Sequence, residues 1–339
     1  MSFADRLVDS WYAPSPTPLA IALAPLSALF AAGAALRRAL YRSRILPAAR
    51  LPVPVVVVGN ISAGGSGKTP LVAALARALR EHGFAPGVVS RGYGRRSERR
   101  AQPLIVTSTS DAELVGDEPL LLARAGSPVA VAADRAAAAR ALLAAHPSCN
   151  VVICDDGLQH YRLARDVEIA VVDGTRGLGN GWLLPAGPLR EPRSRLASVD
   201  AVVVLDRTRA LDFGPATYAM TLEPKPLRRV NAPAIERPIA ELAGKRVHAV
   251  AAIGHPDRFF AQLAALGLHV VAHPFADHHA FVASDLSFGD TAPVVMTEKD
   301  AVKCEAFADE RCWYLPVEAT VEPALVARVV EKLRGSQAA

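Results

Sequence analysis

Apolar and polar positions are distributed along this chain in two different ways. The N-terminal part holds one long apolar segment, Leu19–Leu36, which runs for 18 residues without a charge. As a helix it would be about 27 Å long, slightly less than a hydrocarbon core of about 30 Å. Arginines follow it directly, whereas a secretory signal peptide carries its positive charge before the apolar run. The segment predicts a membrane-associated helix, spanning or interfacial, with a buried or partner-facing helix as the alternative.

After residue 50, short apolar runs alternate with amphipathic stretches. Val53–Gly59 is a continuous β-branched run, which is typical of a strand buried on both faces of a parallel sheet. A helical pattern follows over Thr69–His82. Further strands are predicted at Pro86–Ser90, Leu104–Thr107, Val129–Ala132, Val151–Cys154, Ile169–Asp173 and Ala201–Leu205, and further helices at Glu118–Ala125 and Arg135–His146. This alternation predicts an α/β domain with a doubly wound, mostly parallel sheet.

The rest of the chain predicts a linker and a second, smaller α/β domain. Residues 214–238 are rich in proline, with short polar runs between the prolines. A renewed alternation predicts strands at Arg246–Ile253, His269–Ala272 and Pro293–Thr297, and helices at Arg258–Leu266 and Pro323–Leu333. We therefore expect an N-terminal apolar helix with a basic juxtamembrane segment (1–50), a core (51–213), a linker (214–238) and a C-terminal domain (239–339).

Composition narrows the class of protein. Hydrophobic residues make up 51% of the 339 residues and charged residues 21%, which excludes a disordered chain. The mean hydropathy of +0.21 is high for a soluble enzyme and too low for a protein that spans a membrane many times. Much of the excess lies in the N-terminal apolar segment. Four cysteines without CxxC spacing indicate reduced, buried thiols.

The net charge of +5 is compatible with a membrane surface, an acidic substrate or a nucleic acid as partner. Two basic clusters carry much of it. The first is Arg37, Arg38, Arg42, Arg44 and Arg50, and the second is Arg91, Arg95, Arg96, Arg99 and Arg100. Because no nucleic-acid-binding motif accompanies them, we expect anionic lipids as the partner rather than nucleic acid. No pattern indicates an obligate protein partner.

The first strand–helix junction carries a phosphate-binding sequence. Gly59–Pro70 reads GNISAGGSGKTP, in which glycines free backbone N–H groups to face a phosphate chain. Lys68 would reach the terminal phosphates, and the Thr69 hydroxyl would bind Mg²⁺. The strict P-loop pattern has glycine where this chain has Ser62, but the apolar strand before and the helix after support a P-loop. The expected nucleotide-binding residues are Gly64, Gly65, Ser66, Gly67, Lys68 and Thr69.

A second buried run, Val151–Gly157 (VVICDDG), ends in two carboxylates. Mg²⁺ is usually held by one or two carboxylates together with phosphates and water. Asp155 and Asp156 are therefore candidate metal ligands, and a turn built on Asp156–Gly157 is the structural alternative.

Several longer motifs resemble the tetraacyldisaccharide 4′-kinase family. They are GGSGKTP (64–70), SRGYG (90–94), GDEP (116–119), DDGLQH (155–160), GNGWLLPAGPLREP (179–192), ADHHAF (276–281) and MTEKDAVK (296–303). The resemblance implies a P-loop kinase core and ATP- and Mg²⁺-dependent phosphorylation of the 4′-hydroxyl of a tetraacylated glucosamine disaccharide 1-phosphate. It also implies a role in lipid A biosynthesis at the cytoplasmic face of the bacterial inner membrane, next to the lipid substrate.

The resemblance also implies roles for individual residues. Asp117 of GDEP would act as acid or base together with His278 of the DHH loop, and the sequence leaves open which of them takes the proton. Without the resemblance, Asp117 is equally a helix N-cap and His278 an exposed loop residue. Lys68 and Arg190 would stabilise the transferred phosphate, and Glu191 would join Thr69, Asp155 and Asp156 at the metal. Tentative substrate contacts are Arg91, Gln159, His160 and Asp277.

Two other interpretations remain open at this stage. A P-loop ATPase or GTPase switch would explain GGSGKTP and DDG but not LLPAGPLRE or the DHH loop. A membrane-tethered scaffold with a degenerate P-loop is supported only by Ser62. Glu298, Lys299 and Asp300 follow a predicted strand and are expected near the nucleotide or the interdomain cleft, with a solvated charge run as the equal alternative.

Overall fold

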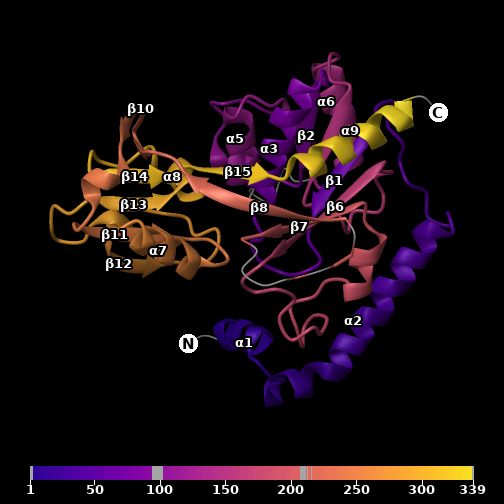
Figure 1. Ribbon diagram of the computed structural model, residues 1–339, viewed down its shortest axis with the longest axis horizontal. Helices are drawn as coiled ribbons and strands as arrows, with labels where there is room; N and C mark the ends of the chain where they lie inside the picture. The colour runs from indigo at the N-terminus through magenta and orange to yellow at the C-terminus, as the bar shows by residue number, and fades with distance from the viewer. Residues whose placement is uncertain (1–2, 94–101, 207–210, 212, 215, 338–339) are drawn as a thin grey trace.

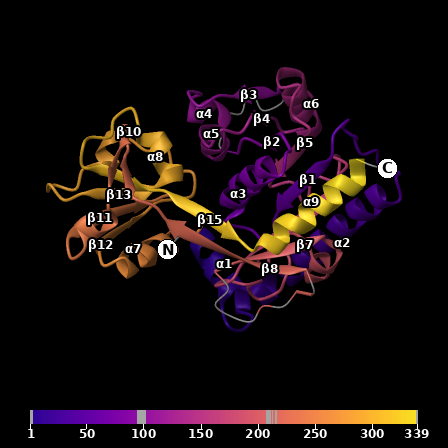
Figure 2. The same ribbon diagram turned by 45° about the horizontal axis from the view of Figure 1, so that its top comes forward.

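The computed structural model describes residues 3–93, 102–206, 211, 213–214 and 216–337. They form an α/β core, a smaller α/β unit beside it, and two N-terminal helices along the core (Figures 1 and 2). The predicted fold class is thereby confirmed. Gly94, Arg95, Arg96, Arg99 and Arg100 of the predicted motif and basic cluster lie outside the described residues.

The N-terminal helices are α1 (Phe3–Tyr12) and α2 (Pro18–Arg42). Thr17 caps α2 by accepting a hydrogen bond from the backbone N–H of Ala20 at 3.2 Å, with Pro18 at the first helical position. The helix is long and apolar enough to cross a membrane, and only 11% of its most apolar window is buried. It is therefore not a buried core helix, and its apolar residues face outward. The large exposed ones are Ile21, Leu26, Leu29, Phe30 and Leu36.

The core sheet has nine strands among the described residues. Their spatial order is β15 (Val317–Val321), β8 (Thr217–Pro224), β7 (Ala201–Leu205), β6 (Val167–Asp173), β1 (Val55–Gly59), β5 (Val151–Asp155), β2 (Pro86–Ser90), β4 (Val129–Val131) and β3 (Leu104–Val106). The inner pairs are parallel, and only the outermost strands, β15 and β3, run antiparallel to their neighbours. The carboxyl ends of the parallel strands thus share one edge, where ligands of such sheets bind.

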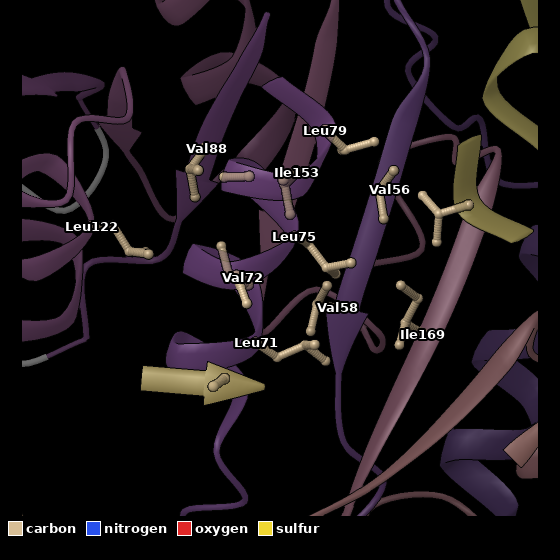
Figure 3. Close-up of a cluster of buried hydrophobic side chains, with 14 of the residues drawn as sticks. Val56, Val58, Leu71, Val72, Leu75, Leu79, Val88, Leu122, Ile153 and Ile169 are labelled. Atoms are coloured by element: carbon tan, nitrogen blue, oxygen red, sulfur yellow. The ribbon is translucent and has the colours of Figure 1, made fainter. Parts of the chain in front are cut away.

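Helices cover both faces of this sheet. The helices of this unit are α3 (Lys68–Glu81), α4 (Ala112–Val115), α5 (Asp117–Arg124), α6 (Arg135–Ala145) and α9 (Pro323–Gln337). Leu71, Leu75 and Leu79 lie one turn apart on α3 and are at most 1% exposed. They face the valines of β1 (Figure 3). Each buried leucine contributes about 1.5–3 kcal/mol, so this contact fixes the P-loop helix against the sheet.

The smaller unit is built on a six-stranded sheet. Its spatial order is β10 (Ala232–Arg237), β9 (Leu227–Arg229), β14 (Cys312–Leu315), β13 (Val294–Thr297), β11 (Arg246–Ala251) and β12 (His269–Pro274). Its helices are α7 (Pro256–Ala265) and α8 (Glu298–Cys304). All four cysteines of the chain are free and buried, as predicted.

The division into domains differs from the expected one at two places. Residues 214–238, expected as a linker, contain β8 of the core sheet and β9 and β10 of the smaller sheet. β15 and α9, expected in the C-terminal domain, return to the core, where β15 pairs with β8 and α9 packs on the core cluster (Figure 2). The chain therefore crosses between the units twice, and β8 and β15 form a paired connection rather than a loose tether.

Candidate functional site

The P-loop connects β1 to α3 at the carboxyl edge of the core sheet. Gly67 caps α3 with a left-handed backbone (φ 80°), and a Cβ there would lie 2.7 Å from Cδ2 of Leu205. Both the conformation and the close approach therefore require glycine. Lys68 is the first residue of the helix, and its Nζ lies 3.5 Å from Oδ1 of Asp156. The loop thus presents a helix N-terminus and a cation at one point, as anion binding needs.

The two carboxylates at the end of β5 differ sharply in their surroundings. Asp155 is 1% exposed, and neither of its carboxylate oxygens has a hydrogen-bond partner. Burial, together with the charges of Glu118 and Asp156, raises the pKa of Asp155 to about 8. Burial alone would raise the pKa of Asp156 as well, but Lys68 and Arg190 outweigh it and lower that pKa.

These carboxylates fit a divalent cation. A buried carboxylate without partners is costly unless a proton or a cation neutralises it. The described residues contain no cluster of three or more His, Cys, Asp or Glu side chains that could hold a metal. A cation here would therefore depend on one or two carboxylates and on phosphate oxygens, which is how Mg²⁺ is commonly bound beside nucleotides.

A cavity of about 1140 Å³ opens above this edge and is lined by both units. The predicted site residues among its lining are Gly64, Gly65, Ser66, Gly67, Lys68, Thr69, Asp156, Arg190, Asp277 and His278. Arg190 approaches Asp156 to 3.7 Å, so two cations flank this carboxylate. The cavity is therefore large enough for a nucleotide and strongly cationic where phosphates would lie.

Asp117 of the core and His278 of the smaller unit meet where the two units contact each other. Asp117 is 5% exposed and is the first residue of α5, while Gly116 is the N-cap, so Asp117 is not the capping residue. Nδ1 of His278 lies 3.2 Å from Oδ2 of Asp117, although this oxygen makes no hydrogen bond of regular geometry. His278 has a left-handed backbone (φ 61°), which is uncommon for a residue with a side chain.

The charges around Asp117 keep it ionised. Burial alone would raise the pKa of Asp117, but contact with His278 and the charge of Lys299 outweigh burial and lower it. An ionised carboxylate with a poorly used lone pair, next to an imidazole, is an arrangement suited to accept a proton.

Comparison with known proteins agrees with this geometry. The family model described as tetraacyldisaccharide-1-P 4′-kinase matches residues 19–334. This chain belongs to the tetraacyldisaccharide 4′-kinase family.

Its relatives match over nearly their whole length. The tetraacyldisaccharide 4′-kinase of Aromatoleum aromaticum is 54% identical over 316 residues, which cover 92% of this chain and 93% of the relative. That of Alkalilimnicola ehrlichii is 55% identical over 324 residues, 95% of each chain. A crystal structure described as the "apo" form of LpxK from Aquifex aeolicus in complex with ATP has a TM-score of 0.78 and 31% identity, over 93% of this chain and 99% of that one.

Glu191, a predicted metal ligand, is held by neighbouring side chains. It was expected to bind the metal, but it is 4% exposed and its carboxylate is already surrounded by donors. Gln159 donates to its Oε1 at 2.8 Å, and Tyr161 and Arg195 donate to its Oε2 at 2.7 and 3.1 Å. In this structure Glu191 therefore organises the loop that carries Arg190, and its role at a metal stays a prediction.

The tentative substrate residues are dispersed. Asp277 lines the cavity, and Gln159 also donates to the backbone oxygen of Asn60 at 3.0 Å. Arg91 is exposed just after β2, and His160 lies outside the cavity, 3.8 Å from Asp134. Burial, assisted by Arg135, lowers the pKa of His160 to about 4, so this side chain is neutral at physiological pH.

Two residues next to the Asp117–His278 pair were not recognised as site residues from the sequence. The sequence predicts Lys299 near the nucleotide or the interdomain cleft without a role, and Glu118 only as the start of a helix. In the structure Nζ of Lys299 lies 3.4 Å from Oε1 of Glu118, and both residues line the cavity. The sequence does carry a signal that both are site residues, since Glu118 adjoins Asp117 in GDEP and Lys299 lies in the MTEKDAVK motif.

Proposed function

We propose that this protein transfers the γ-phosphoryl group of ATP to the 4′-hydroxyl of a tetraacyldisaccharide 1-phosphate, in lipid A biosynthesis. The observation that carries the proposal is that the P-loop of the core and His278 of the smaller unit line one cavity, and that His278 contacts Asp117 of the core at 3.2 Å. ATP bound to the P-loop would direct its terminal phosphate toward the pair. A sugar hydroxyl held between them would lie in line for attack.

Phosphoryl transfer is governed mainly by positioning and by stabilisation of charge on the phosphate oxygens. Lys68 and Arg190 supply two cations at the cavity, and the carboxylate of Asp156 bridges them. Mg²⁺, when bound, would neutralise part of the phosphate charge, with Asp155, Asp156 and Thr69 as the residues proposed to hold it. We propose that Glu191 supports this site from behind.

Asp117 is the proposed base. As the 4′-oxygen bonds to the phosphorus, the bond to ADP breaks and the hydroxyl proton passes to Asp117. The lowered pKa keeps Asp117 ionised and therefore able to take the proton, and the imidazole of His278 lies beside it. His278 belongs to the smaller unit, so the pair exists only where the two units meet.

The membrane helix brings the enzyme to its substrate. A lipid with several acyl chains leaves a bilayer only at a cost of about 0.8 kcal/mol for each CH₂ group. The exposed leucines of α2 and the arginines at its end suit an anionic bilayer surface. α2 is fixed to the catalytic unit, because Ser27 donates to the backbone oxygen of Leu183 at 2.7 Å. We propose that the enzyme acts at the cytoplasmic face of the inner membrane.

The remaining predicted residues are proposed to contact the acceptor. Arg91 and Asp277 would bind the sugar and its phosphate at the mouth of the cavity. Gln159 and His160 would order the strand end that carries Asp156.

A transfer assay tests the proposal. Purified protein, ATP labelled at the γ-phosphate and a tetraacyldisaccharide 1-phosphate in mixed micelles should give labelled lipid. Lys68→Ala should abolish labelling, whereas Lys245→Ala, at an exposed position of the smaller unit, should leave it unchanged. Labelled phosphate released at the same rate with and without lipid would contradict the proposal and favour a nucleotide-hydrolysing switch.

A further inference from the structure

Lys299 is the cation at the centre of the interdomain contact. Its side chain is 16% exposed and extends from the first turn of α8 toward the DHH loop and the start of α5. Nζ lies 3.3 Å from Oδ1 of Asp277, 3.3 Å from Nε2 of His278, 3.4 Å from Oε1 of Glu118 and 3.9 Å from Oδ2 of Asp117. Burial would lower the pKa of Lys299, but the three carboxylates outweigh it and raise that pKa, so Lys299 is charged.

This contact favours one tautomer of the His278 imidazole, because Nε2 lies closer to Lys299 (3.3 Å) than to Oδ1 of Asp277 (3.8 Å). An ammonium group has only donors, so Nε2 of His278 can meet Lys299 at 3.3 Å favourably only as an acceptor. A neutral imidazole with an accepting Nε2 has its proton on Nδ1. Nδ1 is the atom that lies 3.2 Å from Asp117, so the N–H faces the carboxylate. Asp117 can therefore face this N–H group as an ionised carboxylate.

A single residue, Ala252, connects the segments that carry Lys299 and His278. The backbone oxygen of Ala252 accepts from the N–H of His278 at 3.3 Å, and its N–H donates to Oδ2 of Asp300 at 2.9 Å. Asp300 is fully buried and also accepts from the hydroxyl of Thr297, which caps α8. Lys299 lies between Thr297 and Asp300 in the sequence. The backbone of the smaller unit therefore sets its position relative to His278.

We propose that Lys299 is a positioning residue for the transfer reaction, which holds His278 in the Nδ1–H tautomer and keeps Asp117 ionised. The inference rests on the proposed function, because it assigns Lys299 to the reaction of the Asp117–His278 pair. Lys299 differs from Lys68 in its surroundings. Three carboxylates surround the ammonium group of Lys299, whereas Lys68 contacts one carboxylate, that of Asp156, which Arg190 also contacts.

The pH dependence of kcat is the first test. The titratable and charged groups facing Asp117 are Glu118 on α5, Asp277 and His278 on the DHH loop, and Lys299 and Lys303 on α8, with Tyr93 against the His278 ring. An opposite charge within about 4–6 Å lowers a carboxyl pKa by about 1–3 units. Lys299→Gln should therefore move the acidic limb of kcat to higher pH by about one unit or more. KM for ATP should change little.

Two further variants separate charge from structure. Lys299→Arg should restore the wild-type acidic limb, because a guanidinium is also a cation with donors only. Lys245→Gln, a neutralised lysine on the exposed surface, should leave both kcat and the limb unchanged. An unshifted limb in Lys299→Gln overturns the inference. A raised KM for ATP with an unshifted limb would instead make Lys299 a nucleotide ligand.

The ¹⁵N spectrum of the histidine side chains tests the tautomer without a variant of Lys299. The resonances of His278 are identified by their loss in His278→Gln, and the wild-type protein should show a protonated Nδ1 and an unprotonated Nε2. A protonated Nε2 overturns the inference even if Lys299→Gln fails to fold. Failure of the wild-type protein to phosphorylate the lipid would refute the proposed function and leave the tautomer measurement valid.

Discussion

Arg195 provides a quantitative test of how the loop behind the active site is held. Its side chain is 2% exposed and donates from Nε to Glu191 at 3.1 Å and from Nη1 to Ser198 at 2.8 Å, and it also contacts Glu168. Removing one partner of a buried ion pair costs about 3–5 kcal/mol, because the other charge stays buried without compensation. Arg165 still pairs with Glu168 at 3.0 Å in the variant, which favours the lower end of this range.

We therefore expect Arg195→Met to lower the free energy of unfolding by about 3 kcal/mol. For a domain of about 150–250 residues this corresponds to a fall of about 6–12 °C in melting temperature. Differential scanning fluorimetry in detergent, at constant pH and protein concentration, measures it. Arg193→Met is the matched control, because Arg193 lies in the same short helix (Arg193–Ser198) but is exposed, and should shift the melting temperature only slightly.

A double variant shows whether the cost arises from the pair. If Glu191 is the charge left unpaired, Arg195→Met combined with Glu191→Gln should destabilise less than the sum of the single variants. Equal falls in melting temperature for Arg195→Met and Arg193→Met would refute the reasoning. If the losses of stability from Arg195→Met and Glu191→Gln simply add, the unpaired charge of Glu191 is not the cause of the destabilisation.

Other consequences follow from single positions. Leu29→Asp, at a side chain 70% exposed on α2, should weaken binding to anionic vesicles by about tenfold or more, without lowering the melting temperature; unchanged flotation would contradict membrane docking by α2. Gly67→Ala should raise KM for ATP, because its Cβ would lie 2.7 Å from Leu205 and its φ is positive; a wild-type KM would refute this. The pKa of His160 is lowered to about 4, so the folded state disfavours its protonation. The contribution of His160 to the free energy of unfolding is therefore complete above about pH 6.5 and is lost as the pH falls toward 4. The melting temperature of His160→Gln should depend less on pH over this range than that of the wild-type protein.

Much of the core was predictable because its signals are local. Val55–Gly59 and Ala201–Leu205 are unbroken β-branched runs, and strands buried on both faces show such runs whatever their neighbours. β8 and β15 were missed for the opposite reason. They pair antiparallel at the edge of the sheet, so polar and apolar residues mix along them, and prolines beside β8 resemble those of a linker. Their pairing depends on residues far apart in the sequence.

The candidate site shows the same division. The P-loop could be predicted in full because strand, turn and helix are contiguous. Glu191 could not be placed, because the donors that occupy its oxygens, Tyr161 and Arg195, become neighbours only through the fold. Lys299 likewise acquires its surroundings from α5 and the DHH loop, which only the contact between the two units brings together.

The most direct test of the account is the rate at which Asp117→Asn labels the lipid acceptor. The asparagine keeps the size of the side chain but cannot accept the proton of the 4′-hydroxyl. Phosphate transfer under single-turnover conditions should fall by about 10²–10⁴-fold, while ATP affinity, measured by nucleotide titration, stays unchanged. Mass spectrometry of the wild-type product should place the new phosphate on the 4′-position. Transfer by Asp117→Asn at the wild-type rate would contradict the central claim that a carboxylate, assembled across the cleft, activates the acceptor.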